Sequence, residues 1–424
     1  MKCLLAAVLA FALSTSPSLP SVHKTNDIRH IARLYETGRY FELRDALAAL
    51  KDDRSVEIEF FRGAVDQVFN RLDAAVPRLR GFIAATGRSP ACSLAKEAWV
   101  LLADAFRRLG RYRETADAFR SVLDRFGPLL DDAERAGYEN QADSWSSLAG
   151  IPPQSVEFLA DTVIRMTNRH FPVRVGRRTF FVGYDTGANM SVLYKSIADE
   201  LGIAVFGPAI KIQTGTGLWI GGRTGVVPEL ELGSLIVRNV IVLVLPDEVF
   251  PSAKARFGVD RRGLLGAPVL EGFREFTETA AGELIVPARP RSRTTENMCF
   301  SGFMPVVEAF HRGARLGLCL DTGAAATSLF PPFYRRYRGE IDARTRPRLS
   351  LVEGVGKPRA VPVRVLDEFA FRAGGQDLAI RKVMVQTLAT HADSRYFHGT
   401  LGVDIMSQCS RMTLNFVSMS FILR

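Results

Sequence analysis

The sequence predicts a multidomain chain in which an α-helical repeat domain precedes an all-β region made of two similar halves. Three observations lead to this prediction. Apolar residues recur at helical spacing through residues 27–147, most clearly over 98–126. From residue 156 onward the pattern changes to short strands separated by turn residues. Within that second region, two pairs of landmarks have the same separation along the chain.

Residues 1–20 have the features of a signal peptide. Lys2 precedes an apolar run over 4–13, and small residues at 12–14 are suited to cleavage. The run is shorter than the roughly 18 apolar residues that a membrane-spanning helix needs. We therefore expect an exported protein, periplasmic or secreted, without a transmembrane span. An uncleaved anchor is the alternative interpretation.

The helical domain is expected over residues 25–147. One helix ends at a Gly-Arg-Tyr turn at 110–112, and a second helix then runs to Gly127-Pro128. The same turn occurs at 38–40, so 72 residues separate Gly38 from Gly110. This spacing resembles about two tetratricopeptide repeats, with a degenerate middle copy at roughly 58–88. Such a domain either presents a concave surface to a protein partner or serves as a helical spacer.

The sequence Asp-Thr-Gly-Ala occurs twice, and each copy follows an apolar hairpin. The first hairpin, at 171–182 with a turn at Gly176, leads to Asp185. The second, at 303–320 with a turn at 311–313, leads to Asp321. A lone Asp at a strand end commonly forms only an Asx turn, but a matched pair favours a catalytic role.

A Leu-Gly pair follows each Asp-Thr-Gly copy at the same distance. From Asp185 to Gly266 is 81 residues, and from Asp321 to Gly402 is also 81. Equal spacing of two separate landmarks predicts a duplicated lobe of about 120 residues. The predicted domains are lobe 1 at 156–287, a linker at 288–300 and lobe 2 at 301–424.

These motifs resemble those of the retropepsin-like and pepsin-like aspartic proteases over residues 156–424. Alanine after the Gly and short lobes are closer to the retroviral type. The resemblance implies a bilobal all-β endopeptidase whose active site forms within one chain, with no metal and no cofactor. It also implies that Thr186 and Thr322 grip the backbone of the opposite loop.

A pair of aspartates explains how such an enzyme hydrolyses a peptide. The reaction needs a base that activates water and an acid that protonates the carbonyl oxygen. Two carboxylates a few ångström apart cannot both ionise, so they share one proton and supply both functions; aspartic proteases are the standard example. Asp185 and Asp321 are the predicted dyad, and Gly187 and Gly323 permit the tight turns.

A glycine-rich hairpin in the first half is the candidate for a flap over the site. Its candidate substrate-contacting residues are Gly215, Gly217, Trp219 and Gly221. The alternative is a plain surface hairpin with a packed tryptophan. The matching stretch at 352–358 has fewer glycines and no aromatic residue, which predicts an asymmetric lid. Pro268 stands where the second half has Asp404, which predicts a shortened helix after the first Leu-Gly pair.

Other features exclude rival classes. The net charge is +10, but no basic run accompanies a nucleic-acid-binding motif, so a solvated arginine-rich surface is expected. The sequences Gly-x-Ser-x-Gly and His-Glu-x-x-His are absent.

Scattered Cys92, Cys299, Cys319 and Cys409 predict no metal site. A Cys299–Cys409 disulfide is conceivable, and Cys319 is expected to be a small buried hydrophobe.

The sequence as a whole predicts an exported aspartic endopeptidase acting on peptides or proteins. A protein partner of the helical domain is a further expectation. The rival interpretation is a catalytically inert, protease-like scaffold whose helical repeats bind an envelope protein. The sequence leaves the substrate open.

Overall fold

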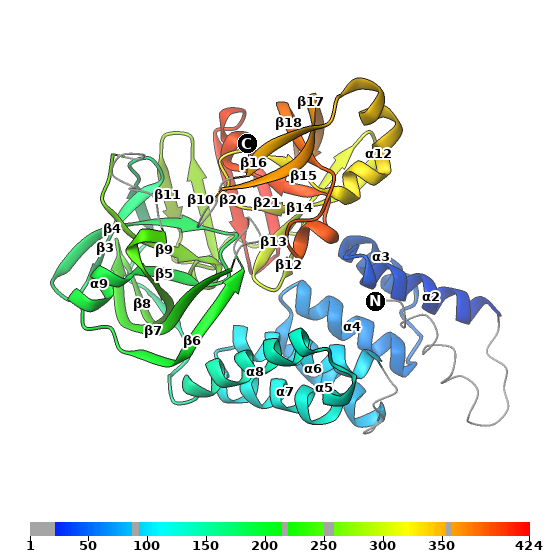
Figure 1. Cartoon of the computed structure of the whole chain (residues 1–424), viewed down its shortest axis with the longest axis horizontal. Coiled ribbons are helices and arrows are strands. Elements are labelled where there is room, and N and C mark those ends of the chain that lie inside the picture. Colours follow the sequence, from blue (N-terminus) through cyan, green and yellow to red (C-terminus); the bar gives the residue numbers. More distant parts are fainter. Residues whose placement is uncertain (1–21, 87–92, 214–218, 250–257, 353–357) are drawn as a thin grey trace. The chain divides into compact units, whose positions relative to one another are not determined.

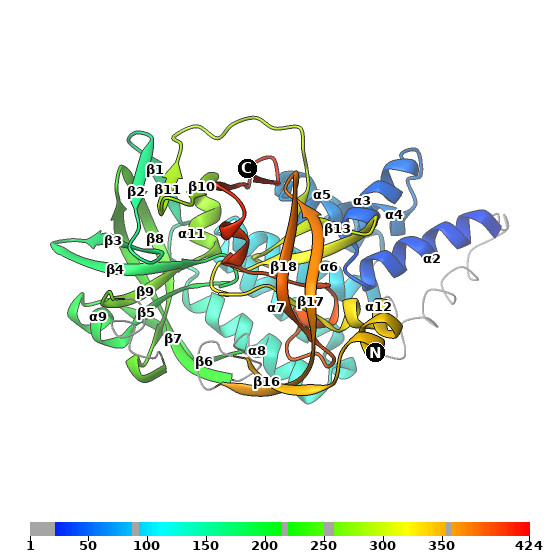
Figure 2. The same cartoon turned by 90° about the horizontal axis from the view of Figure 1, so that it is seen from above.

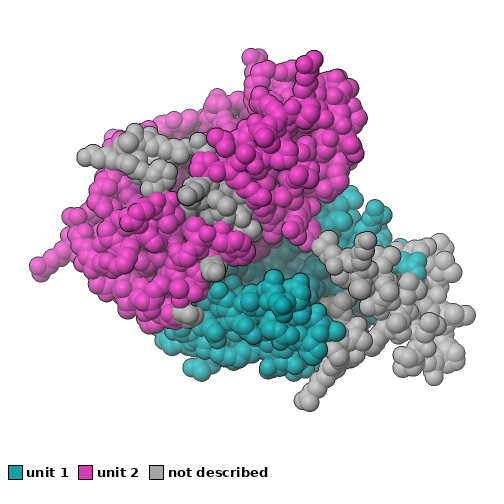
Figure 3. Space-filling model, in the orientation of Figure 1, with its two compact units in different colours: residues 1–153 teal, residues 154–424 magenta. Residues whose placement is uncertain are grey.

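The chain divides into two compact units, residues 1–153 and 154–424, which Figure 3 colours separately. The computed structural model describes residues 22–86, 93–213, 219–249, 258–352 and 358–424. Unit 1 is helical in its described residues, and unit 2 is mostly strand (Figure 1). The predicted order, a helical region followed by a β-rich region, is therefore confirmed.

Short turns at 37–39, 69–71 and 109–111 join pairs of consecutive helices of unit 1 into hairpins. The described helices are α2 (Val22–Glu36), α3 (Tyr40–Ala49), α4 (Val56–Val68), α5 (Leu72–Thr86), α6 (Ser93–Arg108), α7 (Tyr112–Phe126) and α8 (Asp132–Ser147). Each buries an apolar face against its neighbours; in α4, for example, Ile58, Phe60 and Phe61 are buried. A capping box between Asp131 and Glu134 starts α8.

The turns after α2, α4 and α6 share one geometry. Gly38, Asn70 and Gly110 have φ angles of 66°, 61° and 69°. In each case the next residue is an arginine whose backbone N–H donates to the carbonyl five residues earlier, as in a Schellman motif. The middle turn lies inside the expected copy at 58–88. Asparagine replaces glycine there because it tolerates the left-handed region better than most residues.

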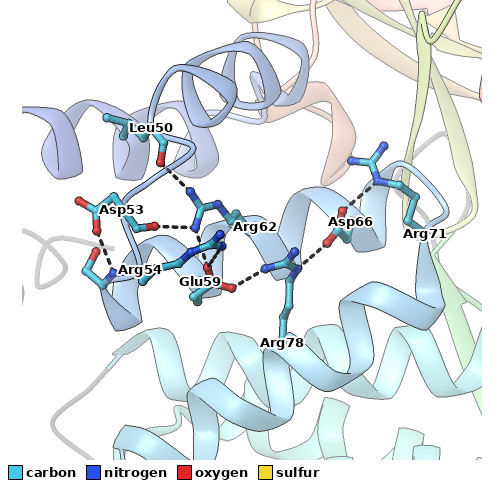
Figure 4. A network of polar contacts seen from close by, with 9 residues as sticks. Leu50, Asp53, Arg54, Glu59, Arg62, Asp66, Arg71 and Arg78 are labelled. Carbon is cyan, nitrogen blue, oxygen red and sulfur yellow. Dashed lines mark hydrogen bonds and ion pairs between the residues drawn. The ribbon is translucent and has the colours of Figure 1, made fainter. Parts of the chain in front are cut away.

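A polar network links α4 to α5 (Figure 4). Glu59 accepts a hydrogen bond from Arg62 at 2.5 Å and another from Arg78. Asp66 accepts from Arg78 at 2.9 Å and from Arg71 at 2.8 Å. Burial alone would raise the pKa of Glu59, but the bonds from Arg62 and Arg78 outweigh it and lower the pKa. Arg78 therefore ties two turns of α4 to α5.

The first half of unit 2 forms an eight-stranded sheet in the order β1-β8-β5-β9-β4-β3-β7-β6. Its strands are β1 (Ser155–Phe158), β3 (His170–Val175), β4 (Arg178–Asp185), β5 (Ser191–Tyr194), β6 (Val205–Gln213), β7 (Trp219–Leu232), β8 (Leu235–Leu245) and β9 (Arg261–Gly266). Two short helices accompany it, α9 (Lys195–Glu200) and α11 (Ala267–Gly272).

The second half forms another eight-stranded sheet, in the order β12-β13-β14-β19-β15-β18-β17-β16. Its strands are β12 (Met298–Ser301), β13 (Met304–His311), β14 (Ala314–Leu320), β15 (Ser328–Leu329), β16 (Arg348–Val352), β17 (Arg359–Ala373), β18 (Gln376–Gln386) and β19 (Gly399–Leu401). The described helices here are α12 (Pro331–Arg344) and the 3₁₀ turns η4 (Asp393–Arg395) and η5 (Val403–Ser407).

The two sheets repeat the same pairings. β4 runs parallel to β9 as β14 does to β19, and β5 runs parallel to β8 as β15 does to β18. The hairpins β3–β4 and β13–β14 are antiparallel, as the sequence predicted. A third sheet joins the halves in the order β2-β11-β10-β20-β21. Its strands are β2 (Thr162–Arg165), β10 (Glu275–Thr279), β11 (Glu283–Val286), β20 (Arg411–Asn415) and β21 (Ser420–Leu423).

Cys299, Cys319 and Cys409 are buried, and no disulfide joins any two of them. The disulfide considered between Cys299 and Cys409 is therefore wrong. Cys299 lies in β12 opposite Val306 of β13, and the Cys409 thiol donates a hydrogen bond to the carbonyl of Ile405. Cys319 is buried as expected, while Cys92 and the proposed signal segment lie outside the described residues. Among the residues that the structure describes, no helix has both the length and the apolar character to cross a membrane.

Candidate active site

Asp185 and Asp321 lie at the carboxyl ends of equivalent strands, β4 and β14. Asp185 is the last residue of β4 and stands beside Gly266 in the parallel pairing with β9. Asp321 directly follows β14, and its backbone N–H donates to the carbonyl of Leu401. Because the two strands end at corresponding places, their loops meet between the two halves.

The carboxyl groups of Asp185 and Asp321 lie side by side, since a Cβ atom added at Gly187 would lie 2.8 Å from Oδ1 of Asp321 and 3.1 Å from Oδ1 of Asp185. Both residues keep some exposed surface, but protein atoms displace most of the water around the Asp321 carboxyl. This desolvation raises the pKa of Asp321 well above its ordinary value, and the charge of Asp185 and the shared hydrogen bond add to it. Backbone N–H groups of Gly323 and Ala324 oppose the shift without cancelling it. Asp321 therefore keeps a proton at a pH where an isolated aspartate has lost one.

Each aspartate also forms the Asx turn that was the alternative interpretation. The N–H of Gly187 donates to Oδ1 of Asp185 at 2.7 Å, and that of Gly323 donates to Oδ1 of Asp321 at 2.8 Å. These bonds orient the carboxyl groups and leave them able to bond to each other. The Asx turns and the pair of carboxyl groups are therefore compatible, and both occur in the same two loops.

The two loops are bonded reciprocally through their threonines. The N–H of Thr186 donates to Oγ1 of Thr322, and the N–H of Thr322 donates to Oγ1 of Thr186, both at 3.0 Å. The Thr186 hydroxyl in turn donates to the carbonyl of Leu320 at 2.6 Å. Both threonines are buried, so these bonds hold the loops together away from competing water.

Gly187 and Gly323 are needed for space, because each loop approaches the opposite carboxyl closely. A Cβ atom at Gly323 would lie 2.4 Å from Oδ2 of Asp185, and one at Gly187 would lie 2.8 Å from Oδ1 of Asp321. Real Cβ atoms essentially never show contacts this short. Any other residue at these positions would separate the two carboxyl groups.

The two Leu-Gly pairs pack directly behind the loops. A Cβ at Gly266 would lie 2.5 Å from the carbonyl oxygen of Met190. The N–H of Gly266 donates to Oγ of Ser191 at 3.0 Å, and the N–H of Gly402 donates to Oγ1 of Thr327 at 3.1 Å. Sequence reasoning missed Ser191 and Thr327, although each lies six residues after its aspartate, a signal that was present in the repeat.

The expected shortening of the helix after Gly266 is wrong. Residues 267–272 form the α-helix α11, whereas the equivalent segment of the second half is the 3₁₀ turn η5. Pro268 lies in the first turn of α11, where its missing N–H costs nothing. Its counterpart Asp404 holds the N–H and hydroxyl of Thr327 at 2.8 and 2.7 Å, so only the second loop has this carboxylate anchor.

The candidate flap is a hairpin of β6 and β7, in which Ile212 pairs with Ile220. Trp219 is 64% exposed, so it is not a packed core residue, and a side chain added at Gly221 would meet nothing within 4 Å. Gly215 and Gly217 lie outside the described residues. Ile212 and Ile220 pack against a small apolar cluster of Val192, Ile210, Leu243 and Leu245.

A buried polar triad next to the site escaped sequence reasoning. Tyr184, the residue before Asp185, donates to the carboxylate of Glu278 and accepts a hydrogen bond from Arg169 at 2.6 Å. Arg169 also forms an ion pair with Glu278. Burial, and then the charge of Glu278, raise the pKa of Tyr184 well above its ordinary value. The triad fastens β4 to the shared five-stranded sheet, and the Asp-Thr-Gly pattern gives no signal for it.

Comparison with known proteins finds one matching family. Residues 171–269 match the aspartyl protease family, and this segment includes Asp185. No curated protein matches the chain. A retropepsin-like aspartic protease from Rickettsia conorii is 21% identical over 31% of this chain and 91% of its own, with a TM-score of 0.21, which is too low for an argument about the fold. The family match supports an aspartic protease. Among the described residues, no group of three or more His, Cys, Asp or Glu side chains is placed to hold a metal ion.

Proposed function

We propose that the chain is an exported aspartic endopeptidase that uses Asp185 and Asp321 to hydrolyse peptide bonds in a peptide or protein substrate. One observation carries the proposal. Two carboxyl groups from loops at equivalent places in the two halves lie side by side, and the pKa of one of them is raised well above its ordinary value. Such a pair supplies a base and an acid at the same pH.

The raised pKa of Asp321 favours this residue as the carrier of the shared proton. In the first step, ionised Asp185 accepts a proton from water as its oxygen attacks the carbonyl carbon, and Asp321 gives its proton to the carbonyl oxygen. In the second step, the C–N bond of the resulting diol breaks. The amine leaves with the proton that Asp185 took from the water, and Asp321 regains its own proton from a hydroxyl of the diol. No covalent enzyme intermediate forms.

The wider proposal comprises two lobes, 156–287 and 301–424, that form one catalytic unit. The five central strands of the two large sheets support it, because they have the equivalent orders β3-β4-β9-β5-β8 and β13-β14-β19-β15-β18. A tetratricopeptide-like domain that binds a protein partner is proposed for the helical unit. The support there is the repeated turn at Gly38, Asn70 and Gly110.

The test compares purified wild-type protein with Asp185→Asn and Asp321→Asn on casein and on a peptide library. Cleavage positions are read by mass spectrometry, with and without a pepstatin-type inhibitor. Each substitution should lower kcat/KM by more than about a thousandfold while the circular dichroism spectrum stays unchanged. Asp377→Asn, at an exposed position on β18, is the matched control and should retain activity. Full activity of both active-site variants, or no cleavage by the wild type, would contradict the proposal.

A further inference from the structure

An exposed apolar patch lies on the β16–β17 hairpin of the second half. Leu349 and Leu351 are 74% and 63% exposed, and their cross-strand partners are Pro362 and Ala360. Paired residues of an antiparallel hairpin lie on the same face. Of the four residues, only Pro362 is half-buried, so the other three present apolar groups to solvent over two neighbouring strands.

The patch belongs to the outer face of this hairpin. Val361 and Val363 alternate with the patch residues along β17, and they are 2% and 1% exposed. Their face is therefore packed into the protein, and the patch points the other way. None of the patch residues contributes to the paired Asp-Thr-Gly loops described above.

The end of α12 borders the same face. Arg364, two residues beyond Pro362 on β17, donates to the carbonyl of Thr345 at 2.7 Å and forms an ion pair with Asp342 at 2.9 Å. These contacts fix the last turn of α12 beside the hairpin, and Figure 2 shows α12 running on into β16. In the first half, α9 has only six residues, so the longer helix distinguishes the second half.

The neighbouring surface is strongly basic. Exposed arginines of α12 and of the segment leading into β16 are Arg335, Arg336, Arg338, Arg344 and Arg346. The acidic residues of this stretch pair with arginines, Glu340 with Arg312 and Arg344, and Asp342 with Arg338 and Arg364. The positive charges of Arg335, Arg336 and Arg346 are therefore not balanced within this stretch, and Arg346 lies three residues before Leu349.

We propose that this patch docks the protein on an anionic lipid surface. Leu349 and Leu351 would enter the acyl-chain boundary while the arginines contact lipid phosphates, which is how amphipathic surfaces bind membranes. A lipid surface accepts protruding leucines without a shaped counterpart. A second copy of the chain is disfavoured, because two such patches would bring like charges together. The docking does not depend on the catalytic proposal.

The test uses the full chain and sedimentation with vesicles of phosphatidylcholine, with and without phosphatidylglycerol. Wild-type protein should bind the anionic vesicles more tightly, and added salt should weaken binding. Replacing Leu349 and Leu351 by Ser should weaken binding about tenfold per leucine. Replacing Arg346 by Gln should weaken it about fivefold.

Leu159→Ser is the matched control, because Leu159 is 64% exposed elsewhere in unit 2; this variant should bind as the wild type does. Unchanged circular dichroism shows that each variant folds. Equal binding to both vesicle types, or unaltered binding by the Leu349/Leu351 and Arg346 variants, would overturn the proposal. So would a wild-type dimer in analytical ultracentrifugation that the leucine variant abolishes, since the patch would then bind a second copy.

Discussion

Thr277 and Thr413 stand opposite each other in the antiparallel pair β10–β20, with their hydroxyl oxygens 2.8 Å apart. They are 136 residues apart, the same separation as that of Thr186 and Thr322. A residue that stands opposite its equivalent in the other half lies at the local two-fold axis that relates the two halves. The loops of the candidate active site, related by the same offset, lie about that axis. The shared sheet thus sets the alignment of the two carboxyl groups.

The raised pKa of Asp321 predicts how pH changes stability. A carboxyl group whose pKa is higher in the folded than in the unfolded state favours folding at low pH, and this advantage is lost as pH rises through the folded-state pKa. Asp321→Asn removes this titration. Its melting temperature minus that of the wild type should therefore be larger at pH 8 than at pH 4, measured by calorimetry. A difference independent of pH would contradict the raised pKa.

The reciprocal threonine bonds predict that valine and serine substitutions at Thr186 differ strongly in their effect on stability. Thr186→Val leaves the N–H of Thr322 and the carbonyl of Leu320 buried without their partner, which should cost about 2 kcal/mol in free energy of unfolding. Thr186→Ser keeps the hydroxyl and should restore most of the loss. Urea titration measures the stability, and kcat should fall with little change in KM for the valine variant. Equal stability of the two variants would show that the hydroxyl bonds are not needed.

The space beside Asp185 predicts that Gly323→Ala removes activity. Its Cβ would lie 2.4 Å from Oδ2 of Asp185, so the carboxyl groups must separate. The expected loss in kcat/KM is at least about a hundredfold, from a misplacement of about 1 Å. Gly339→Ala, on α12, where the added carbon meets nothing within 4 Å, is the control and should keep its activity. A fully active Gly323→Ala enzyme would mean that the loops tolerate separation.

The buried triad predicts that Tyr184→Phe destabilises unit 2. The substitution removes a hydrogen bond to a buried carboxylate and one from Arg169, at a cost of about 2 kcal/mol in free energy of unfolding. Tyr334→Phe removes a half-buried phenol from Asp342 and should cost about 0.5–1 kcal/mol. Chemical denaturation of the full chain compares them. Similar losses for both variants would show that the triad adds nothing beyond an ordinary tyrosine contact.

Local patterns in the sequence predicted the order of the two units and the hairpins before each aspartate. Turn glycines and alternating apolar residues act over a few positions, so they can be read directly. The sequence located the middle helical turn only approximately, because Asn70 takes the left-handed conformation that glycine takes in the other two turns. Pro268 led to the wrong prediction of a shortened helix, because a proline in the first turn does not interrupt a helix.

Contacts between distant segments could not be read from the sequence. Glu278 meets Tyr184 across 94 residues, and Thr327 meets Asp404 across 77. Neither pair has a motif, because a buried carboxylate is specified by the strand pairing that surrounds it. Aligning the two halves at the 136-residue offset would have shown Ser191 and Thr327 at matching positions.

The residues 136 positions after Arg169, Tyr184 and Glu278 are Pro305, Leu320 and Leu414, so the polar triad has an apolar counterpart in the second half. An identical-subunit dimer would have to accept every substitution twice, once in each copy. Two fused halves escape that restriction, since one gene can alter either half alone. The triad, the Asp404 anchor and the arginine-bearing helix are each found in one half only. A single chain thus allows the two halves to carry different side chains around a centre whose loops match.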